Sequence, residues 1–247
     1  MIDGLLAAIG FLTRVPVPPR VFAVAGVQSR SLAWYPLVGA LLGGVLCALA
    51  WGVQGWPPLL GAAVVLVAWV LLTGALHLDG LADSADAWVG GLGGNPVESR
   101  ERTLTIMKDP RSGPVGVVAV VLVLLLKFAA LASIPASSWW ALLLAPTLAR
   151  AALVTAFLGT PYVRSGGLGS GLVAAPRVAC WAALVATLVL CGAFGWRGGI
   201  ALAVALLVFA WWRRACLRRL AGMTGDTCGA LTELVEAAVL VAVIAVA

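Results

Sequence analysis

Charged residues are scarce in this sequence, and their scarcity decides its broad class. Only 11% of the 247 residues are charged, while 62% are hydrophobic. A soluble domain typically carries about 25% charged and 45–50% apolar residues. The chain therefore has too little polar surface for a soluble enzyme, a disordered tail or a nucleic-acid-binding module. Its long apolar runs lack the alternation of an outer-membrane barrel, so we predict an α-helical integral membrane protein.

Histidine and paired cysteines are also lacking. The single histidine, His77, excludes a metal centre built from several histidines. No Cys-x-x-Cys motif occurs, so neither a zinc site nor a disulfide framework is expected. The five cysteines are scattered, mostly within apolar runs: Cys47, Cys180, Cys191, Cys216 and Cys228.

The first twelve residues lack the basic start of a signal peptide. Their apolar run at residues 4–12 precedes the first arginine, Arg14. We predict a short interfacial or re-entrant helix here.

Apolar runs long enough to cross a bilayer recur along the chain. A spanning helix needs about 20 mostly apolar residues. We predict an all-α polytopic membrane protein with about seven transmembrane helices, forming one catalytic domain over residues 1–247. Polar loops lie at 79–112, 159–177 and 213–228. The predicted spans are 34–54, 59–78, 113–133, 137–158, 178–196, 198–212 (a short one) and 229–247.

Basic residues orient this layout. If the N-terminus is cytoplasmic and the spans alternate, 13 of the 16 basic residues fall on the cytoplasmic side. This agrees with the positive-inside rule. Arg197 falls outside, and Lys127 and Arg150 lie within spans. The inside set is Arg14, Arg20, Arg30, Arg100, Arg102, Lys108, Arg111, Arg164, Arg177, Arg213, Arg214, Arg218 and Arg219.

The acidic residues test the layout independently, because they were not used to build it. All ten fall on the cytoplasmic side or in the first turns of the last span. A transporter would be expected to place polar groups near the bilayer midplane, where only Lys127 and Arg150 are candidates. The one-sided distribution favours a membrane-embedded enzyme acting on cytoplasmic substrates.

The strongest local motif is His-Leu-Asp-Gly-Leu-Ala-Asp-Ser-Ala-Asp at residues 77–86. In a helix, Asp79, Asp83 and Asp86 fall within roughly 60° of one another and share a face. Three neighbouring carboxylates repel one another, and Mg²⁺ is the natural compensating cation. A solvated polar helix end is the simpler alternative. His77 falls on the opposite side of the wheel, where a structural role and a substrate contact both stay open.

A second acidic motif surrounds Asp226, in Met-Thr-Gly-Asp-Thr-Cys-Gly-Ala at residues 223–230. Asp226 is a candidate metal ligand or a simple N-cap of the last helix. Glu233 and Glu236 lie further along that apolar helix, where a carboxylate is costly. They are candidate ligands of a second metal, or of a cation shared between helices.

Basic candidates for binding phosphate lie near these acids. Lys108 and Arg111 follow a short predicted helix, which Pro110 stops. Arg14 and Arg164 are further candidates. Each is also explained by topology or by contact with lipid headgroups. Acids for metal and bases for phosphate on one membrane face indicate phosphoryl or nucleotidyl-phosphate transfer.

With these motifs, the chain resembles the cobalamin synthases, the adenosylcobinamide-GDP ribazoletransferases. The resemblance rests on the two acidic motifs with Glu233 and Glu236, on Phe-Leu-Thr-Arg-Val-Pro-Val-Pro at 11–18, and on Ile-Met-Lys-Asp-Pro-Arg-Ser-Gly at 106–113 with Gly116 and Lys127. These elements run from residue 11 to residue 236 in family order.

The resemblance implies a reaction, a cofactor and a location. Adenosylcobinamide-GDP reacts with α-ribazole or its 5′-phosphate, giving adenosylcobalamin or its phosphate and GMP, with Mg²⁺ required. The expected location is the bacterial inner membrane, with the active face cytoplasmic and membrane lipid as a partner. No nucleic acid partner is expected, and a homo-oligomer stays open.

On this basis we assign roles to the candidate residues. Asp79, Asp83 and Asp86 hold Mg²⁺ against the pyrophosphate, and Lys108 or Arg111 neutralises developing charge. Asp86 or Asp226 accepts the proton of the attacking hydroxyl. The remaining candidates contact substrate (Arg14, Arg164 and His77) or metal (Asp226, Glu233 and Glu236).

Two rival functions remain at this stage. A CDP-alcohol phosphotransferase is the nearer one, and Asp-Gly-Leu-Ala at 79–82 imitates part of its motif. The Ala-Arg pair and the later Asp-x3-Asp of that motif are missing. A transporter or channel is the more distant rival.

Overall fold

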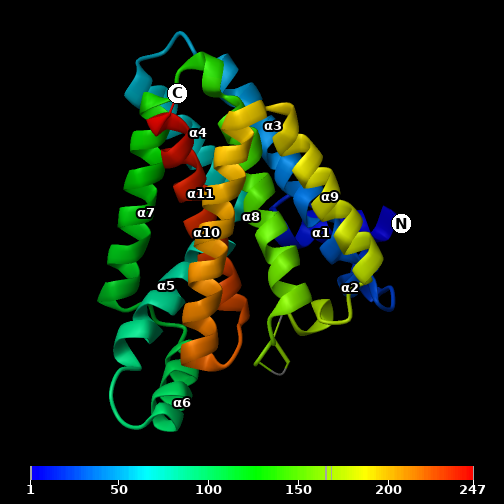
Figure 1. The fold of residues 1–247 in the computed structure, drawn as a ribbon, viewed down its shortest axis with the longest axis vertical. Helices are drawn as coiled ribbons and strands as arrows, with labels where there is room; N and C mark the ends of the chain where they lie inside the picture. Colours follow the sequence, from blue (N-terminus) through cyan, green and yellow to red (C-terminus); the bar gives the residue numbers. More distant parts are fainter. Residues whose placement is uncertain (1, 165, 168, 247) are drawn as a thin grey trace.

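The computed structural model describes residues 2–164, 166–167 and 169–246 as a bundle of helices (Figure 1). Within these ranges the only β-type pairing is an isolated parallel bridge between Tyr162 and Met223. The prediction of an all-α fold is confirmed.

The described helices differ in length. They are α1 (Ile2–Leu12), α2 (Val27–Ser31), α3 (Tyr35–Gly52), α4 (Pro58–Thr73), α5 (Leu76–Gly90), α6 (Pro96–Ile106), α7 (Pro114–Ser133), α8 (Trp140–Gly159), α9 (Arg177–Ala193), α10 (Gly195–Leu220) and α11 (Gly225–Ala245). Four 3-10 turns lie between them: η1 (Pro19–Ala23), η2 (Leu32–Trp34), η3 (Ala136–Ser138) and η4 (Ser170–Leu172).

Five described helices are long and apolar enough to cross a membrane, or six if the bent pair α4–α5 counts as one span. Helix α9, Arg177–Ala193, is a shorter apolar helix. The predicted number of about seven is therefore approximate, while the multi-pass character agrees with the prediction.

Two predicted boundaries were wrong. The span expected at 59–78 breaks at Gly74, whose φ of 62° ends α4, and α5 leaves at an angle of 86° to it. The segment after residue 212, expected to be a polar loop, instead continues α10 to Leu220. Arginine and leucine are good helix formers, and the long arginine stems cover apolar surface while their charged heads reach water.

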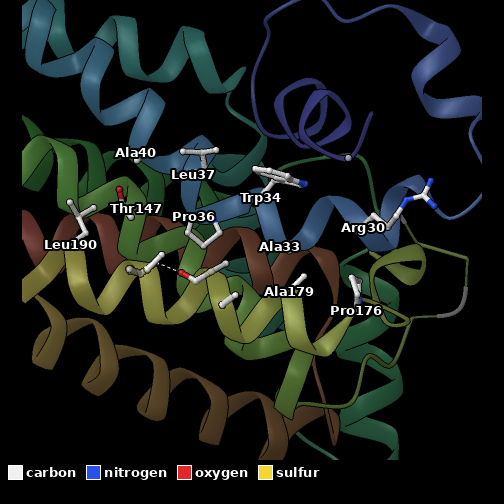
Figure 2. A pocket seen from close by; sticks show the side chains of 15 residues that line it. Arg30, Ala33, Trp34, Pro36, Leu37, Ala40, Thr147, Pro176, Ala179 and Leu190 are labelled. Atoms are coloured by element: carbon white, nitrogen blue, oxygen red, sulfur yellow. Dashed lines mark hydrogen bonds between the residues drawn. The ribbon is translucent and has the colours of Figure 1, made fainter. Parts of the chain in front are cut away.

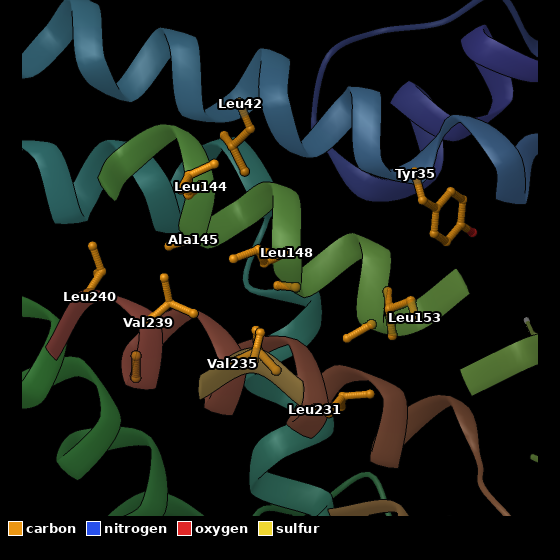
Figure 3. Close-up of a cluster of buried hydrophobic side chains, with 14 of the residues drawn as sticks. Tyr35, Leu42, Leu144, Ala145, Leu148, Leu153, Leu231, Val235, Val239 and Leu240 are labelled. Carbon is orange, nitrogen blue, oxygen red and sulfur yellow. The ribbon is translucent and has the colours of Figure 1, made fainter. Parts of the chain in front are cut away.

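Helices α8 and α11 form the centre of the bundle. In their most apolar stretches 78% and 67% of residues are buried, against 17% in α10, which lies at the periphery. Leu148 of α8 lies on the side of Val235 and Val239 of α11 in the core, while Leu144 lies next to Leu42 of α3 (Figure 3). On its other side α8 packs closely on α3, where an added side chain at Gly39 would meet backbone atoms of Pro146.

The polar connections gather at one end of the bundle (Figure 1). Helices α5 and α6, the start of α7, the end of α10 and the start of α11 all lie at this end, whereas the C-terminus lies at the other. The arrangement matches the predicted one-sided chemistry. Which membrane face this end occupies stays a prediction.

Candidate active site at the crossing of α5 and α11

Helices α5 and α11 touch through their backbones. A Cβ atom on Gly80 would lie 2.7 Å from the backbone oxygen of Asp226 and 3.1 Å from the Cα of Gly229. Small residues allow such close crossings between membrane helices. The crossing brings the acidic motif of α5 against the acidic start of α11.

Thr224, and not Asp226, caps the start of α11. The Thr224 side chain accepts a hydrogen bond from the backbone N–H of Thr227, and the Thr227 side chain accepts one from the backbone N–H of Thr224. The interpretation of Asp226 as the N-cap was therefore wrong. Its carboxylate, in the first turn of α11, is left for other partners.

The partner of the Asp226 carboxylate is Arg164, from the loop after α8. Arg164 Nη1 donates to Asp226 Oδ2 at 2.9 Å, with the two side chains 30% and 18% exposed. The loop is fixed beside α11 because the Met223 N–H donates to the Pro161 carbonyl and the Val163 N–H donates to the Met223 carbonyl. Two distant segments of the sequence thus form one wall.

The carboxylates of α5 gather round Asp83. The helical face predicted for Asp79, Asp83 and Asp86 is present, although helix α5 covers residues 76–90 where a polar loop was expected from residue 79. The side chains of Asp79, Asp226 and Asp86 all lie within Coulombic range of Asp83. The Arg164 guanidinium also lies within this range. Four acids against one guanidinium leave a net negative charge.

Asp86 differs from its neighbours because it anchors α7. Its carboxylate accepts hydrogen bonds from the backbone N–H of Gly113 at 2.7 Å and of Gly116 at 2.9 Å. A carboxylate is favourable at a helix N-terminus, where the first N–H groups have no partner within the helix. Asp86 therefore positions α7 against α5.

The oxygen donors here fit a hard divalent cation in charge and kind. Among the residues that the structure describes, no three His, Cys, Asp or Glu side chains converge closely enough to hold a metal ion as they stand. The fit therefore rests on Asp79, Asp83 and Asp226 together, of which, in the described part of the chain, only Asp226 is paired with a guanidinium, that of Arg164. The metal site stays a prediction.

Lys108 and Arg111 lie on a segment tied to this cluster at both ends. Thr224 Oγ1 lies 3.7 Å from Met107 Sδ, and Gly113 is held by Asp86. Lys108 is exposed. Arg111 is exposed too and forms an ion pair with Asp109 at 2.8 Å, which lowers the pKa of that carboxyl to about 2.

The other two predicted substrate contacts lie at the turn between α4 and α5. The Arg14 N–H donates to the Leu72 carbonyl at 2.7 Å, and the Arg14 side chain covers Gly74. His77, two residues after the turn, is only 3% exposed, and its backbone packs against Gly229.

Glu233 and Glu236 have different partners from those predicted. Lys127 Nζ donates to Glu233 Oε2 at 2.6 Å and to Glu236 Oε2 at 2.5 Å, while Arg150 forms an ion pair with Glu236. All four side chains are at least 95% buried. Because two cations already neutralise two carboxylates, we leave Glu233 and Glu236 out of the proposed metal site.

Sequence reasoning noticed Lys127 and Arg150 but missed their role. The signal was present, since charged groups inside spans normally pair with one another. The sequence analysis also missed Phe157 and Tyr162, whose rings are stacked with their centroids 5.8 Å apart. No spacing in the sequence distinguishes these two rings from ordinary core aromatics.

A cavity of about 540 Å³ lies next to the crossing of α5 and α11. Asp79, Asp226, Arg164 and His77 line it together with apolar and glycine residues. A second cavity, of about 620 Å³, lies between η2–α3 and α9, where Trp34, Leu37 and Leu190 face it and Arg30 lies at one end (Figure 2). No carboxylate lines this second cavity, so the predicted chemistry belongs to the first.

Fold and site define a polytopic helical membrane protein whose polar chemistry sits at one end of the bundle, as in a membrane-embedded enzyme. Comparison with known families then gives the particular one. The family model described as Cobalamin-5-phosphate synthase matches residues 4–244, and the chain belongs to this family.

Curated relatives resemble the chain over nearly its whole length. Proteins of Pseudomonas paraeruginosa and Pseudomonas aeruginosa are 54% and 55% identical to it, covering 98% and 97% of the chain and 97% and 96% of their own lengths. A protein of Pseudomonas fluorescens is 52% identical, covering 96% of the chain and 97% of its own length. All three are named adenosylcobinamide-GDP ribazoletransferase. No solved structure matches the chain.

Proposed function

We propose that this protein is an adenosylcobinamide-GDP ribazoletransferase of cobalamin biosynthesis. A ribose hydroxyl of α-ribazole, or of its 5′-phosphate, forms a new P–O bond to the phosphorus attached to cobinamide. The pyrophosphate bond breaks, GMP leaves, and the hydroxyl proton passes to a base. The family, the names of its relatives and the acidic cluster beside a cavity support this proposal.

The observation that carries the chemistry is the excess of carboxylates around Asp83. Asp79, Asp83 and Asp226 would hold Mg²⁺, which when bound supplies positive charge to the pyrophosphate oxygens. Asp86 has a separate task, since its hydrogen bonds to Gly113 and Gly116 fix α7 next to these acids.

Asp226 is the better candidate for accepting the hydroxyl proton. Both Asp86 oxygens already accept backbone N–H groups, whereas Asp226 lines the cavity and is engaged by Arg164 through one oxygen. Asp226 Oδ1 is therefore the atom that we assign to the proton.

We assign the binding of phosphate to three basic residues. Arg164 lines the cavity and lies at hydrogen-bond distance from Asp226. Lys108 and Arg111 lie on the exposed segment between Met107 and Gly113 and reach solvent. A guanidinium or ammonium here neutralises the charge that develops on the phosphoryl oxygens.

We further propose that the active end faces the cytoplasm of a bacterial inner membrane. The support is the excess of basic residues in the connections at this end. The nucleotide substrates would then be reached from the side on which they are made.

The proposal is tested by supplying both substrates to the purified protein in detergent. Adenosylcobinamide-GDP and α-ribazole 5′-phosphate are incubated with it, with Mg²⁺ or with EDTA, and products are followed by mass spectrometry. Equal amounts of GMP and cobalamin phosphate, formed only with Mg²⁺, are expected. Absence of both products, with turnover of a CDP-alcohol or uptake into vesicles instead, would contradict it.

A further inference from the structure

The cavity beside the α5–α11 crossing has an apolar wall and a polar side. Tyr35 of α3 and Leu153 of α8 belong to the apolar wall and are both buried in the core (Figure 3). The other large apolar residues lining it are Phe11, Leu12, Leu76, Phe157 and Leu172. Asp79, Asp226 and Arg164 form the polar side. A ligand that fits this cavity has a flat apolar part and a polar part.

The volume of the cavity fits one substrate of the proposed reaction but not the corrinoid part of the other. At about 540 Å³ it lies within the usual range for a small-molecule site, roughly 300–1,000 Å³. A nucleoside fits such a volume. A corrin ring with its amide side chains and adenosyl ligand is several times larger than a nucleoside, and it would remain outside.

Two residues that line the cavity, His77 and Tyr162, each carry a buried polar atom without a hydrogen-bond partner among the described residues. His77 is 3% exposed and lines the cavity, and its Nδ1 has no hydrogen-bond partner among the described residues. A buried polar group without a partner is costly, and a ligand that supplies one gains from it. Benzimidazole offers a single unsubstituted ring nitrogen with a lone pair once its other nitrogen carries the ribose.

We propose that this cavity binds the nucleoside substrate, with its benzimidazole base against the stacked rings of Phe157 and Tyr162 and hydrogen-bonded by His77. The ribose then extends toward Asp79 and Asp226, while the corrinoid binds outside the cavity. This assignment rests on the proposed function.

The guanine base of the other substrate is the competing occupant. Guanine carries several donors and acceptors along one edge, each of which needs a partner when buried. The wall is mostly apolar, as at Phe157, Leu153 and Leu172. Its buried side-chain atoms that lack a partner among the described residues are His77 Nδ1 and the Tyr162 hydroxyl, fewer than the edge of guanine needs. The apolar wall therefore favours benzimidazole over guanine.

Direct binding tests the assignment without turnover. α-Ribazole 5′-phosphate is titrated into the purified full-length protein with Mg²⁺ and without corrinoid, and heat of binding is recorded. Phe157→Ala is expected to raise the Kd at least tenfold, because base stacking on an aromatic ring is lost. An unchanged Kd would overturn the assignment.

Phe194→Ala is the matched control. Phe194 stacks on Trp140 at 5.2 Å with a 24° angle between rings, much as Phe157 stacks on Tyr162 at 5.8 Å and 24°. Trp140 begins α8 and Phe157 lies near its end, so the two pairs lie at opposite ends of that helix. The Kd of the Phe194→Ala protein is expected to stay within twofold of the wild-type value.

GMP is titrated into the same proteins to test the competing occupant. Phe157→Ala is expected to leave the Kd for GMP within twofold, and the KM for adenosylcobinamide-GDP likewise. A tenfold rise in either, with an unchanged Kd for α-ribazole 5′-phosphate, would overturn the assignment in favour of guanine.

His77→Phe keeps the assignment testable if Phe157→Ala does not fold. An indole analogue of α-ribazole 5′-phosphate lacks the free ring nitrogen, so the wild-type protein should bind it at least fivefold more weakly. His77→Phe should abolish this difference. A preference for benzimidazole that survives in His77→Phe would overturn the role of His77.

Failure of this inference is distinguishable from failure of the proposed function. If GMP is released and Phe157→Ala binds α-ribazole 5′-phosphate normally, only the cavity assignment fails. If wild-type protein binds α-ribazole 5′-phosphate with the expected losses in the variants but never releases GMP, the cavity assignment stands and the proposed reaction fails.

Discussion

Arg164 and Asp226 are joined by a hydrogen bond of 2.9 Å although 62 residues separate them in the sequence. The bond links the loop after α8 to the first turn of α11 at the edge of the cavity. It fixes the orientation of the carboxylate that we assign to proton transfer, and it keeps a guanidinium beside the proposed phosphate position.

Replacing this arginine should remove activity without unfolding the protein. Arg164→Gln is expected to lower kcat/KM about 100-fold, as loss of one charge-stabilising donor does in other active sites. Arg177→Ala, an exposed arginine at the start of α9, is the control and should stay within twofold. Activity is measured as GMP release and folding by thermal unfolding in detergent. Wild-type activity of Arg164→Gln would contradict the role of this pair.

The buried ion pairs among Lys127, Arg150, Glu233 and Glu236 should contribute chiefly to the stability of the fold. Glu236→Gln leaves Arg150 and Lys127 without a full complement of negative charge, and breaking such a pair costs about 3–5 kcal/mol. We expect Tm in detergent to fall by about 10 °C. Asp109→Ala, which breaks the exposed pair with Arg111, should leave Tm unchanged. A Glu236→Gln protein with wild-type Tm would show that the cluster does not hold the helices together.

The backbone contact between α5 and α11 should not tolerate a residue larger than glycine at position 80. A Cβ atom at Gly80 would lie 2.7 Å from a backbone oxygen of α11, so Gly80→Val must push the two helices apart. Asp79 and Asp83 would move away from Asp226, and we expect GMP release to fall at least tenfold. Gly44→Val is the control, because apart from its chain neighbours and the backbone of its own helix nothing lies within 4 Å of the added carbon at Gly44. Equal activity of the two variants would contradict the crossing as the basis of the site.

Much of the architecture was predictable because lipid imposes simple demands. Spans must be apolar and internally hydrogen-bonded, so α7 and α8 begin within about three residues of the predicted positions. Helix α11 begins four residues earlier than predicted, at Gly225. The break between α4 and α5 was missed because the sequence stays apolar through it. Only the left-handed backbone of Gly74 and Ala75 marks the turn.

The site was predictable where it depends on the period of one helix. Asp79, Asp83 and Asp86 belong to α5 as expected, because the 3.6-residue repeat is local. The partners of Asp86 and Glu236 were not predictable in the same way. Gly113 and Arg150 reach them only after the helices pack, and a single sequence does not encode that packing as a spacing.

The most direct test of the central claim compares Asp83→Asn with the wild-type protein across a Mg²⁺ titration. Glu101→Gln, an exposed acid on α6, is the matched control. We expect Asp83→Asn to insert in the membrane with normal Tm and to release no GMP at any Mg²⁺ concentration, while Glu101→Gln follows the wild-type curve. An Asp83→Asn protein that releases GMP at the wild-type rate and Mg²⁺ dependence would contradict the acidic cluster as the site of the transfer reaction.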